Sequence, residues 1–88
     1  MAIEKAASKQ LVIASGRAHQ GLAQEVAEIL QTDLVPVTAY DFANGEIFVR
    51  FEESVRGCDA FVIQSHTAPV NKQIMEQLIM VDALKRAS

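Results

Sequence analysis

Hydrophobic and polar residues along the chain follow patterns that predict extended segments at four places. Two short apolar runs, at residues 11–14 and 60–63, are typical of buried strands. Across residues 46–52, apolar and polar residues alternate with a period of two, which predicts a half-exposed strand. A further extended segment is expected to start at 34–37. Because Pro36 has no backbone N–H, we expect that segment at a sheet edge or a strand start.

Two other segments carry apolar residues at helical spacing. In the first, Gln24, Glu25 and Glu28 are expected to face water. The stripe expected to face the core consists of Leu22, Val26, Ile29 and Leu30. The second helix is expected to begin with Asn71 as its N-cap. Apolar residues surround nearly its whole circumference at 74–84, so it is expected to be buried on most sides.

The order of these elements is typical of an α/β fold in which the first and last strands are parallel. With 88 residues, half of them hydrophobic, the chain is one domain or part of one. Only one Tyr and four Phe are aromatic, so the core is expected to be aliphatic. Residues 1–9 are expected to form a loose leader before the folded part at 10–88.

The last helix reaches Ser88 without a Gly or Pro that would end it. A helix that is apolar all round also needs more protein around it than so short a chain supplies. We therefore expect either further chain or a partner subunit to complete the fold.

Charge and composition argue against several classes of protein. The formal net charge of -3 disfavours a nucleic-acid binder, which usually presents a basic face. No apolar run approaches the roughly 20 residues of a membrane span, and the polar start lacks the apolar core of a secretion signal. The single cysteine, Cys58, cannot form an internal disulfide. A soluble cytoplasmic protein is the simplest interpretation.

Asn44 and Gly45 lie between two extended segments and are first of all a hairpin signal, because both tolerate positive φ. A ligand loop is the alternative. Glu46 and Asn44 can present an acceptor and an amide to the edge of a base, and Phe42 can supply an apolar face for stacking. These are suitable groups for adenine, although their spacing is not diagnostic.

Ser54 and Arg56 place a hydroxyl and a guanidinium two residues apart at a strand-exit turn. Such a pair can hold an anion, since a guanidinium matches phosphate and carboxylate geometry. The alternative is an exposed turn with a solvated arginine, and Glu52 and Glu53 would partly neutralise an anion site.

The remaining polar groups suggest less. Residues 15–19 join a strand to a helix without a P-loop or dinucleotide fingerprint, so they are interpreted as a connecting turn. His66 has no second ligand in view and is interpreted as structural, and Cys58 as a packing residue.

Taken together, four segments resemble the ribose-phosphate pyrophosphokinase family, and its bacterial members in particular. They are SGRAH at 15–19, FANGE at 42–46, EESVRGCDAFVIQS at 52–65 and NKQIMEQLIMVDALKRAS at 71–88. The loop at 42–46 matches the family loop that receives the adenine of ATP, which implies that role for Phe42, Asn44, Gly45 and Glu46. In the family this loop reaches an active site formed largely by a neighbouring subunit.

Ser54 and Arg56 match part of the family's regulatory anion site, where phosphate activates and ADP inhibits. The resemblance also implies a fold of two domains like type I phosphoribosyltransferases, each a parallel sheet with flanking helices, assembled into a homohexamer of dimers. This chain would hold the first part of the amino-terminal domain, incomplete at Ser88, and no second domain.

For the whole enzyme the resemblance implies magnesium-dependent transfer of the diphosphate of ATP to ribose 5-phosphate, with release of AMP. The family's metal ligands and phosphate clamps match no residue of this chain. The chain is therefore expected to contribute adenine recognition and part of the regulatory site, and to be inactive alone. The alternative is a non-catalytic assembly or regulatory module that docks on full-length subunits.

Overall fold

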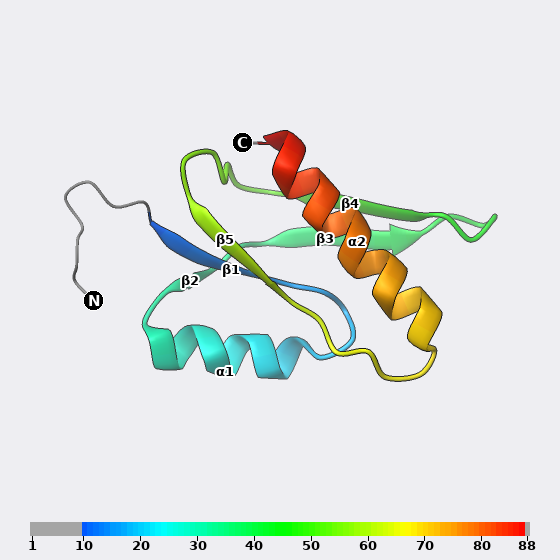
Figure 1. Cartoon of the computed structure of the whole chain (residues 1–88), viewed down its shortest axis with the longest axis horizontal. Coiled ribbons are helices and arrows are strands. Elements are labelled where there is room, and N and C mark those ends of the chain that lie inside the picture. The colour runs from blue at the N-terminus through cyan, green and yellow to red at the C-terminus, as the bar shows by residue number, and fades with distance from the viewer. Residues whose placement is uncertain (1–9, 88) are drawn as a thin grey trace.

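The computed structural model describes residues 10–87, so the leader expected at 1–9 lies outside the described residues, as does Ser88. In chain order the elements are β1 (Leu11–Ser15), α1 (Gln20–Leu30), β2 (Asp33–Leu34), β3 (Val37–Asp41), β4 (Ile47–Phe51), β5 (Asp59–Ile63) and α2 (Val70–Ala87) (Figure 1). Within this range no helix is both long enough and apolar enough to cross a membrane.

The strands form two separate sheets. β1 is the middle strand of a parallel sheet with the order β2-β1-β5. Its register with β5 runs from Leu11 opposite Asp59 to Ser15 opposite Ile63, which confirms that the first and last strands are parallel. β3 and β4 form an antiparallel hairpin, which crosses the molecule and ends in a free tip at the right of Figure 1.

The extended segment expected to start at 34–37 is divided between β2, at the edge of the parallel sheet, and β3, which belongs to the other sheet. Val35 still follows the parallel sheet, since its N–H donates to the Ile13 carbonyl at 2.8 Å. Pro36 has no N–H to continue that ladder, and its carbonyl accepts from the Glu52 N–H at 2.9 Å instead. The proline thus lies just before the start of β3, where the chain changes sheets.

α1 turns a different face to the sheet from the one that the pattern predicts. Ala23 and Ala27 are buried against Ile13, whereas Ile29 is 79% exposed and Leu30 is also exposed. Two alanines one turn apart allow a close approach of the helix to the sheet, which larger side chains on that face would prevent. The predicted leucine and isoleucine stripe is therefore wrong as the buried face.

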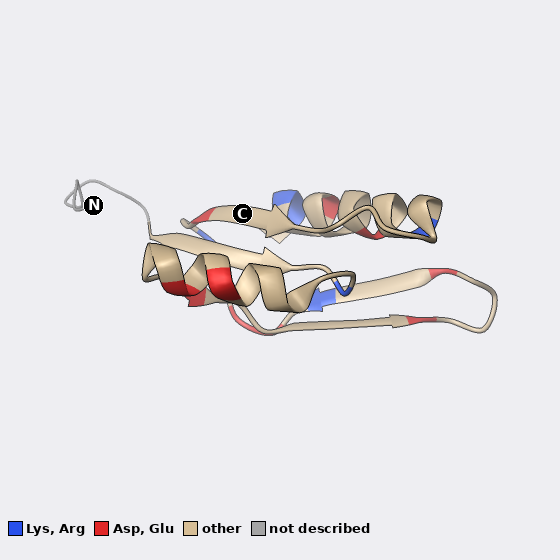
Figure 2. Cartoon of the chain, turned by 90° about the horizontal axis from the view of Figure 1, so that it is seen from below, with Lys and Arg blue, Asp and Glu red and all other residues tan. Residues whose placement is uncertain are grey.

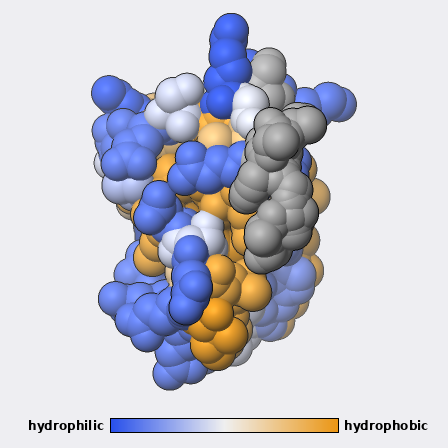
Figure 3. All heavy atoms as spheres, turned by 90° about the vertical axis from the view of Figure 1, so that its left-hand side faces the viewer, coloured by the Kyte–Doolittle hydropathy of each residue, from blue (hydrophilic) through white to orange (hydrophobic). Residues whose placement is uncertain are grey.

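The polar side of α1 is where the pattern places it. Gln24, Glu25 and Glu28 are exposed, and Figure 2 shows acidic residues along this helix. The large apolar residues of α1 nevertheless remain uncovered, and Figure 3 shows apolar surface at the lower end of the face where α1 ends.

α2 is buried along one narrow strip only. Its buried residues are Glu76 and Met80, which lie one turn apart. Five large apolar residues of α2 are exposed: Val70, Ile74, Met75, Leu78 and Val81. The expectation of burial on most sides is wrong for the described chain, because β4 and β5 pack against α2 but leave these large side chains exposed. The expected cap is also wrong, since α2 begins at Val70 and Asn71 lies within its first turn.

β5 is less buried than its apolar sequence predicts. It is an edge strand of the parallel sheet, and Phe61 is 49% exposed. α1 packs mainly on β1 and β2, and on β5 it reaches Ile63 but leaves Phe61 half exposed. The central strand β1 is buried as expected, at Val12, Ile13 and Ala14.

Candidate ligand-binding site

The Asn44-Gly45 signal produces a hairpin, as the sequence predicts. The Phe42 N–H donates to the Glu46 carbonyl at 2.7 Å, and the Gly45 N–H donates to the Phe42 carbonyl at 2.9 Å. The Asn44 side-chain oxygen accepts from the Glu46 N–H at 3.1 Å. Gly45 has a φ of 96°, which side chains with a Cβ rarely adopt. The structure therefore brings all four predicted adenine-loop residues together at one exposed tip.

An aromatic cluster supports this tip. Tyr40 and Phe48 are cross-strand partners whose rings stack at 4.9 Å between centroids. Phe42 meets them edge-on, at 5.3 Å from Tyr40 and 6.3 Å from Phe48. Such edge-to-face pairs favour a fixed ring orientation. Sequence reasoning missed Tyr40 and Phe48, although a turn centred on Asn44 would have placed both on the Phe42 side of the hairpin.

The loop has free polar groups beside this aromatic cluster. The Asn44 side-chain oxygen accepts a hydrogen bond within the turn, which leaves the side-chain NH₂ group as a donor. The Glu46 carboxylate is exposed and can accept from an exocyclic amine. Phe42 is 44% exposed, so part of its ring is open for stacking. An aromatic face with one donor and one acceptor suits a nucleobase.

The second candidate site lies at the opposite end of β4, in the turn that leads to β5. Val55 is buried against Val12 and Val35 and anchors this turn in the core. Ser54 and Arg56 flank Val55 and are exposed, and the Ser54 hydroxyl accepts from the Arg56 N–H at 3.3 Å. The five residues of β4 separate this turn from the adenine loop, a strand length of about 17 Å.

A polar network that sequence reasoning missed joins the β1–α1 turn to α2. The Glu76 side chain is only 1% exposed. It accepts from the Arg17 N–H at 2.7 Å and from Arg17 Nε at 2.9 Å. A buried carboxylate is costly unless it is paired and hydrogen-bonded, and both conditions are met. The segment interpreted as a connecting turn thus carries the main partner of the buried charge.

Gln64 extends this network from the end of β5. Its side-chain oxygen accepts from the Ala18 N–H at 3.1 Å, and its NH₂ group donates to Glu76 at 3.3 Å. This arrangement depends on Gly16, because a Cβ there would lie 2.0 Å from the Gln64 oxygen. Gly16, directly before Arg17 in the sequence, is a signal that could have indicated close packing of side chains at this turn.

Arg17 also links the network to the hairpin. Arg17 Nη2 lies 2.8 Å from Asp41 Oδ1, and Lys72 Nζ lies 2.6 Å from Asp41 Oδ2. The hydrogen bonds from Lys72 and Arg17 hold the pKa of Asp41 below its usual value. Hydrogen bonds to Glu76 and Asp41 raise the pKa of Arg17.

The other polar residues offer less chemistry. His66 is paired with Gln77, at 2.6 Å between His66 Nε2 and the amide oxygen, which agrees with a structural role. Cys58 is half-buried and packs against the cluster around Val55, as a packing residue does. Within residues 10–87, no three His, Cys, Asp or Glu side chains are grouped so as to hold a metal ion.

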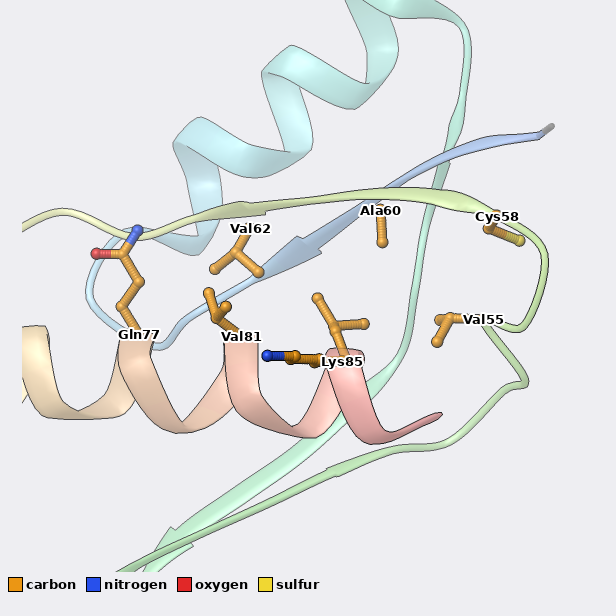
Figure 4. Close-up of a pocket in the computed structure, with 8 residues that line it drawn as sticks. Val55, Cys58, Ala60, Val62, Gln77, Val81 and Lys85 are labelled. Atoms are coloured by element: carbon orange, nitrogen blue, oxygen red, sulfur yellow. The ribbon is translucent and has the colours of Figure 1, made fainter. Parts of the chain in front are cut away.

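An apolar groove of about 400 Å³ lies between β5 and α2. Figure 4 shows Val62 and Val81 facing each other across it, with Cys58 and Val55 at one end. Gln77 and Lys85 bring the polar groups of α2 to its lining. The groove continues the apolar surface of α2 rather than forming a site with convergent polar groups.

Comparison with known proteins decides the family. The sequence profile described as the N-terminal domain of ribose phosphate pyrophosphokinase matches residues 11–88. The chain belongs to the ribose-phosphate pyrophosphokinase family. This confirms the resemblance carried by the loop and turn sequences.

Curated relatives agree with this assignment. A ribose-phosphate pyrophosphokinase of Streptomyces coelicolor is 62% identical over 86 residues, which are 98% of this chain and 26% of the relative. One of Corynebacterium efficiens is 66% identical over 80 residues, covering 91% of this chain and 25% of the relative. The chain therefore spans about a quarter of the length of these relatives.

A solved structure shows the same fold. The crystal structure of phosphoribosylpyrophosphate synthetase from Mycobacterium smegmatis aligns with a TM-score of 0.87 at 65% identity. The match covers 91% of this chain and 27% of that chain. The prediction of a partial α/β domain of this family, with a parallel sheet and flanking helices, is confirmed.

Proposed function

We propose that this chain supplies adenine recognition to a ribose-phosphate pyrophosphokinase through the hairpin loop at 42–46. The observation that carries the proposal is the exposed tip itself. Phe42 presents an aromatic face, and Asn44 and Glu46 present a donor and an acceptor beside it. In the complete enzyme, ATP and ribose 5-phosphate would be the substrates, and phosphoribosyl pyrophosphate and AMP the products.

The proposal includes a second role, as part of a regulatory anion site at the turn after β4. Val55 holds this turn in the core, so Ser54 and Arg56 project from a fixed base. An exposed guanidinium on such a base suits phosphate or the phosphates of ADP. Because the Ser54 hydroxyl accepts from the Arg56 N–H, its proton remains free to donate to an anion.

Several parts of the proposal concern the complete enzyme. Magnesium would neutralise the phosphates of ATP, but the carboxylates and histidines of residues 10–87 form no group suited to it. We also propose a cytoplasmic location. We further propose that the complete enzyme is a homo-oligomer, since the uncovered apolar surface of α2 suits burial in a larger assembly.

Titration of the ¹⁵N-labelled chain with ATP tests the recognition role. We expect ATP to shift the amide signals of residues 42–46, and GTP, which lacks the exocyclic amine at that position, to shift them less. Weak binding is expected, since the chain would hold only part of the site. Shifts confined to other residues, or equal shifts with GTP, would refute adenine recognition by this loop.

Titration with phosphate and ADP tests the regulatory role. The amides around Arg56 should respond to phosphate, and Arg56→Gln should remove the response while Arg50→Gln on the neighbouring strand preserves it. An assay of the chain with ATP, magnesium and ribose 5-phosphate should give no phosphoribosyl pyrophosphate. Steady turnover there would contradict the expectation of inactivity alone.

A second candidate function is a non-catalytic module that docks on full-length subunits. The exposed apolar residues of α2 favour it, with Leu78 and Met75 each more than half exposed. Size-exclusion chromatography with the full-length Streptomyces coelicolor relative would test this function. Co-elution that is lost in Leu78→Lys supports docking through α2, and separate elution of the two proteins argues against it.

A further inference from the structure

The polar contacts that join the hairpin tip to other elements are made by the residue before the 42–46 loop, and not by the loop itself. In residues 10–87, the hydrogen bonds of 42–46 stay inside the loop. All of these residues are exposed. The preceding residue, Asp41, ends β3 and carries the ion pairs that leave the hairpin. Asp41 therefore carries the ion pairs nearest to the loop that reach other elements.

The two oxygens of the Asp41 carboxylate contact two different elements. Oδ1 lies 2.8 Å from Arg17 Nη2, in the β1–α1 turn. Oδ2 lies 2.6 Å from Lys72 Nζ, in the first turn of α2. Two charge-assisted contacts from different directions restrain the orientation of the carboxylate as well as its distance. In Figure 1 the hairpin tip, the β1–α1 turn and the start of α2 all lie toward the same end of the molecule.

One of these two cations is itself rigidly held. Arg17 donates its backbone N–H and its Nε to the two oxygens of Glu76, at 2.7 and 2.9 Å. Glu76 is buried, so the guanidinium is fixed to the interior of the domain. Its Nη2 then contacts both Glu76, at 2.7 Å, and Asp41. A continuous series of contacts thus runs from a buried carboxylate to the residue beside Phe42.

We propose that Asp41 is a positioning residue that holds the 42–46 loop in a fixed orientation relative to α2 and the β1–α1 turn. The proposal deepens the proposed function and rests on it for its role in ATP binding. Phe42 follows Asp41 directly in the chain, so the direction of its ring depends on the backbone that Asp41 restrains. Arg17 and Lys72 act through Asp41 and do not need to touch the nucleotide.

A plain surface ion pair is the alternative interpretation. The three side chains are between 32% and 45% exposed, and pairs of this kind add little to global stability. The two interpretations differ in what they predict. A surface pair predicts no change in the loop when it is removed, whereas a positioning residue predicts reorientation of the loop with little change in the unfolding curve.

Residual dipolar couplings of the ¹⁵N-labelled full chain measure the orientation of the loop directly. In Asp41→Asn we expect the couplings of residues 42–46 to change relative to those of β1 and α1. Asp41→Glu keeps the carboxylate and should largely restore them. Asp82→Asn removes another paired carboxylate, bonded to Arg86 at 2.7 Å, and should leave the loop couplings unchanged. Lys72→Met is a second variant that removes one partner without altering the hairpin sequence.

ATP titration of the same variants separates positioning from recognition. We expect Asp41→Asn to weaken the ATP affinity measured from the loop shifts about twofold to fivefold, the range that exposed ion pairs supply. Asp41→Glu should recover this affinity. If ATP does not shift the loop even in the unaltered chain, adenine recognition fails, and the couplings still decide the positioning role. Loop couplings that stay the same in both Asp41→Asn and Lys72→Met would overturn the proposal.

Discussion

The parallel sheet and the hairpin are stabilised in different ways, although they lie side by side in one small chain. In the sheet, Val12, Ile13 and Ala14 are all buried, and α1 packs closely on Ile13 through Ala23. In the hairpin, no residue of β3 or β4 is buried. The hairpin is nevertheless the region that carries the candidate adenine loop.

The parallel sheet is therefore the rigid part of the molecule, and the hairpin is the part proposed to recognise adenine. Apolar packing fixes the sheet, whereas the hairpin contacts α2 along β4 and is held by Asp41 at the tip and by buried Val55 in the turn that follows β4. A region with little apolar burial costs little to reorient. Such a region can adapt to a ligand or a neighbouring subunit, and it needs specific polar contacts to keep its position.

The largest effect is expected from Glu76→Ala, which removes the buried carboxylate that binds Arg17 of the β1–α1 turn and Gln64 after β5. The substitution leaves Arg17 without its main partner and opens a cavity next to Met80. We expect a loss of about 2–4 kcal/mol in the free energy of unfolding, below the full cost for a buried pair because Arg17 is partly exposed. Urea unfolding measures it. Asp82→Ala on the exposed side of α2 is the control, and equal losses in the two variants would contradict this account.

Ala23→Leu tests whether close packing holds α1 to the sheet. Ala23 is fully buried, so the larger side chain must push the helix away, at a cost of about 1–3 kcal/mol. The neighbouring Gln24→Leu adds the same side chain on the exposed face and should change stability little. Thermal unfolding compares the two variants. A stabilising effect of Ala23→Leu would mean that the predicted leucine stripe, and not the alanine face, meets the sheet.

Gly45→Ala tests the hairpin alone. The positive φ of Gly45 disfavours any residue with a Cβ, and the cost is expected to be about 1 kcal/mol. Because the sheet does not depend on this turn, amide hydrogen exchange should accelerate in β3 and β4 and stay unchanged in β1. Gly21→Ala, in a helix with open space at that position, is the control. Uniform acceleration across the chain would show that the two regions unfold together.

The smallest effect is expected from acid. The folded pKa of Asp41 is depressed by Lys72 and Arg17, so its contribution is fully present above the ordinary aspartate pKa of about 3.9. The contribution is lost as the pH falls through the lower folded value. NMR titration of the Asp41 carboxyl in the unaltered chain and in Lys72→Met measures this. An unchanged titration midpoint in Lys72→Met would contradict the geometry.

Much of the fold was predictable from the sequence, because strand and helix periods appear in local patterns. The 11–14 run and the 46–52 alternation both became strands. The choice of buried face was not predictable, since it depends on how closely two elements approach. Hydrophobic size favoured Leu22 and Ile29, whereas the sheet takes Ala23 because a small side chain permits contact.

The candidate site was predictable in part for the same reason. Phe42 to Glu46 form a local turn, and its residues carry the signal themselves. The Arg17, Asp41 and Glu76 network joins residues up to 59 positions apart. No local pattern contains such a network, so only the folded arrangement of the β1–α1 turn, the hairpin and α2 reveals it.

The most direct test of the central claim compares two exposed phenylalanines. Phe42 in the hairpin loop is 44% exposed, and Phe61 at the edge of the parallel sheet is 49% exposed. The account predicts that Phe42→Ala removes most of the ATP-induced shifts of the loop amides, whereas Phe61→Ala binds ATP like the unaltered chain. Equal responses of the two variants, with ATP binding retained in both, would contradict adenine recognition by the hairpin.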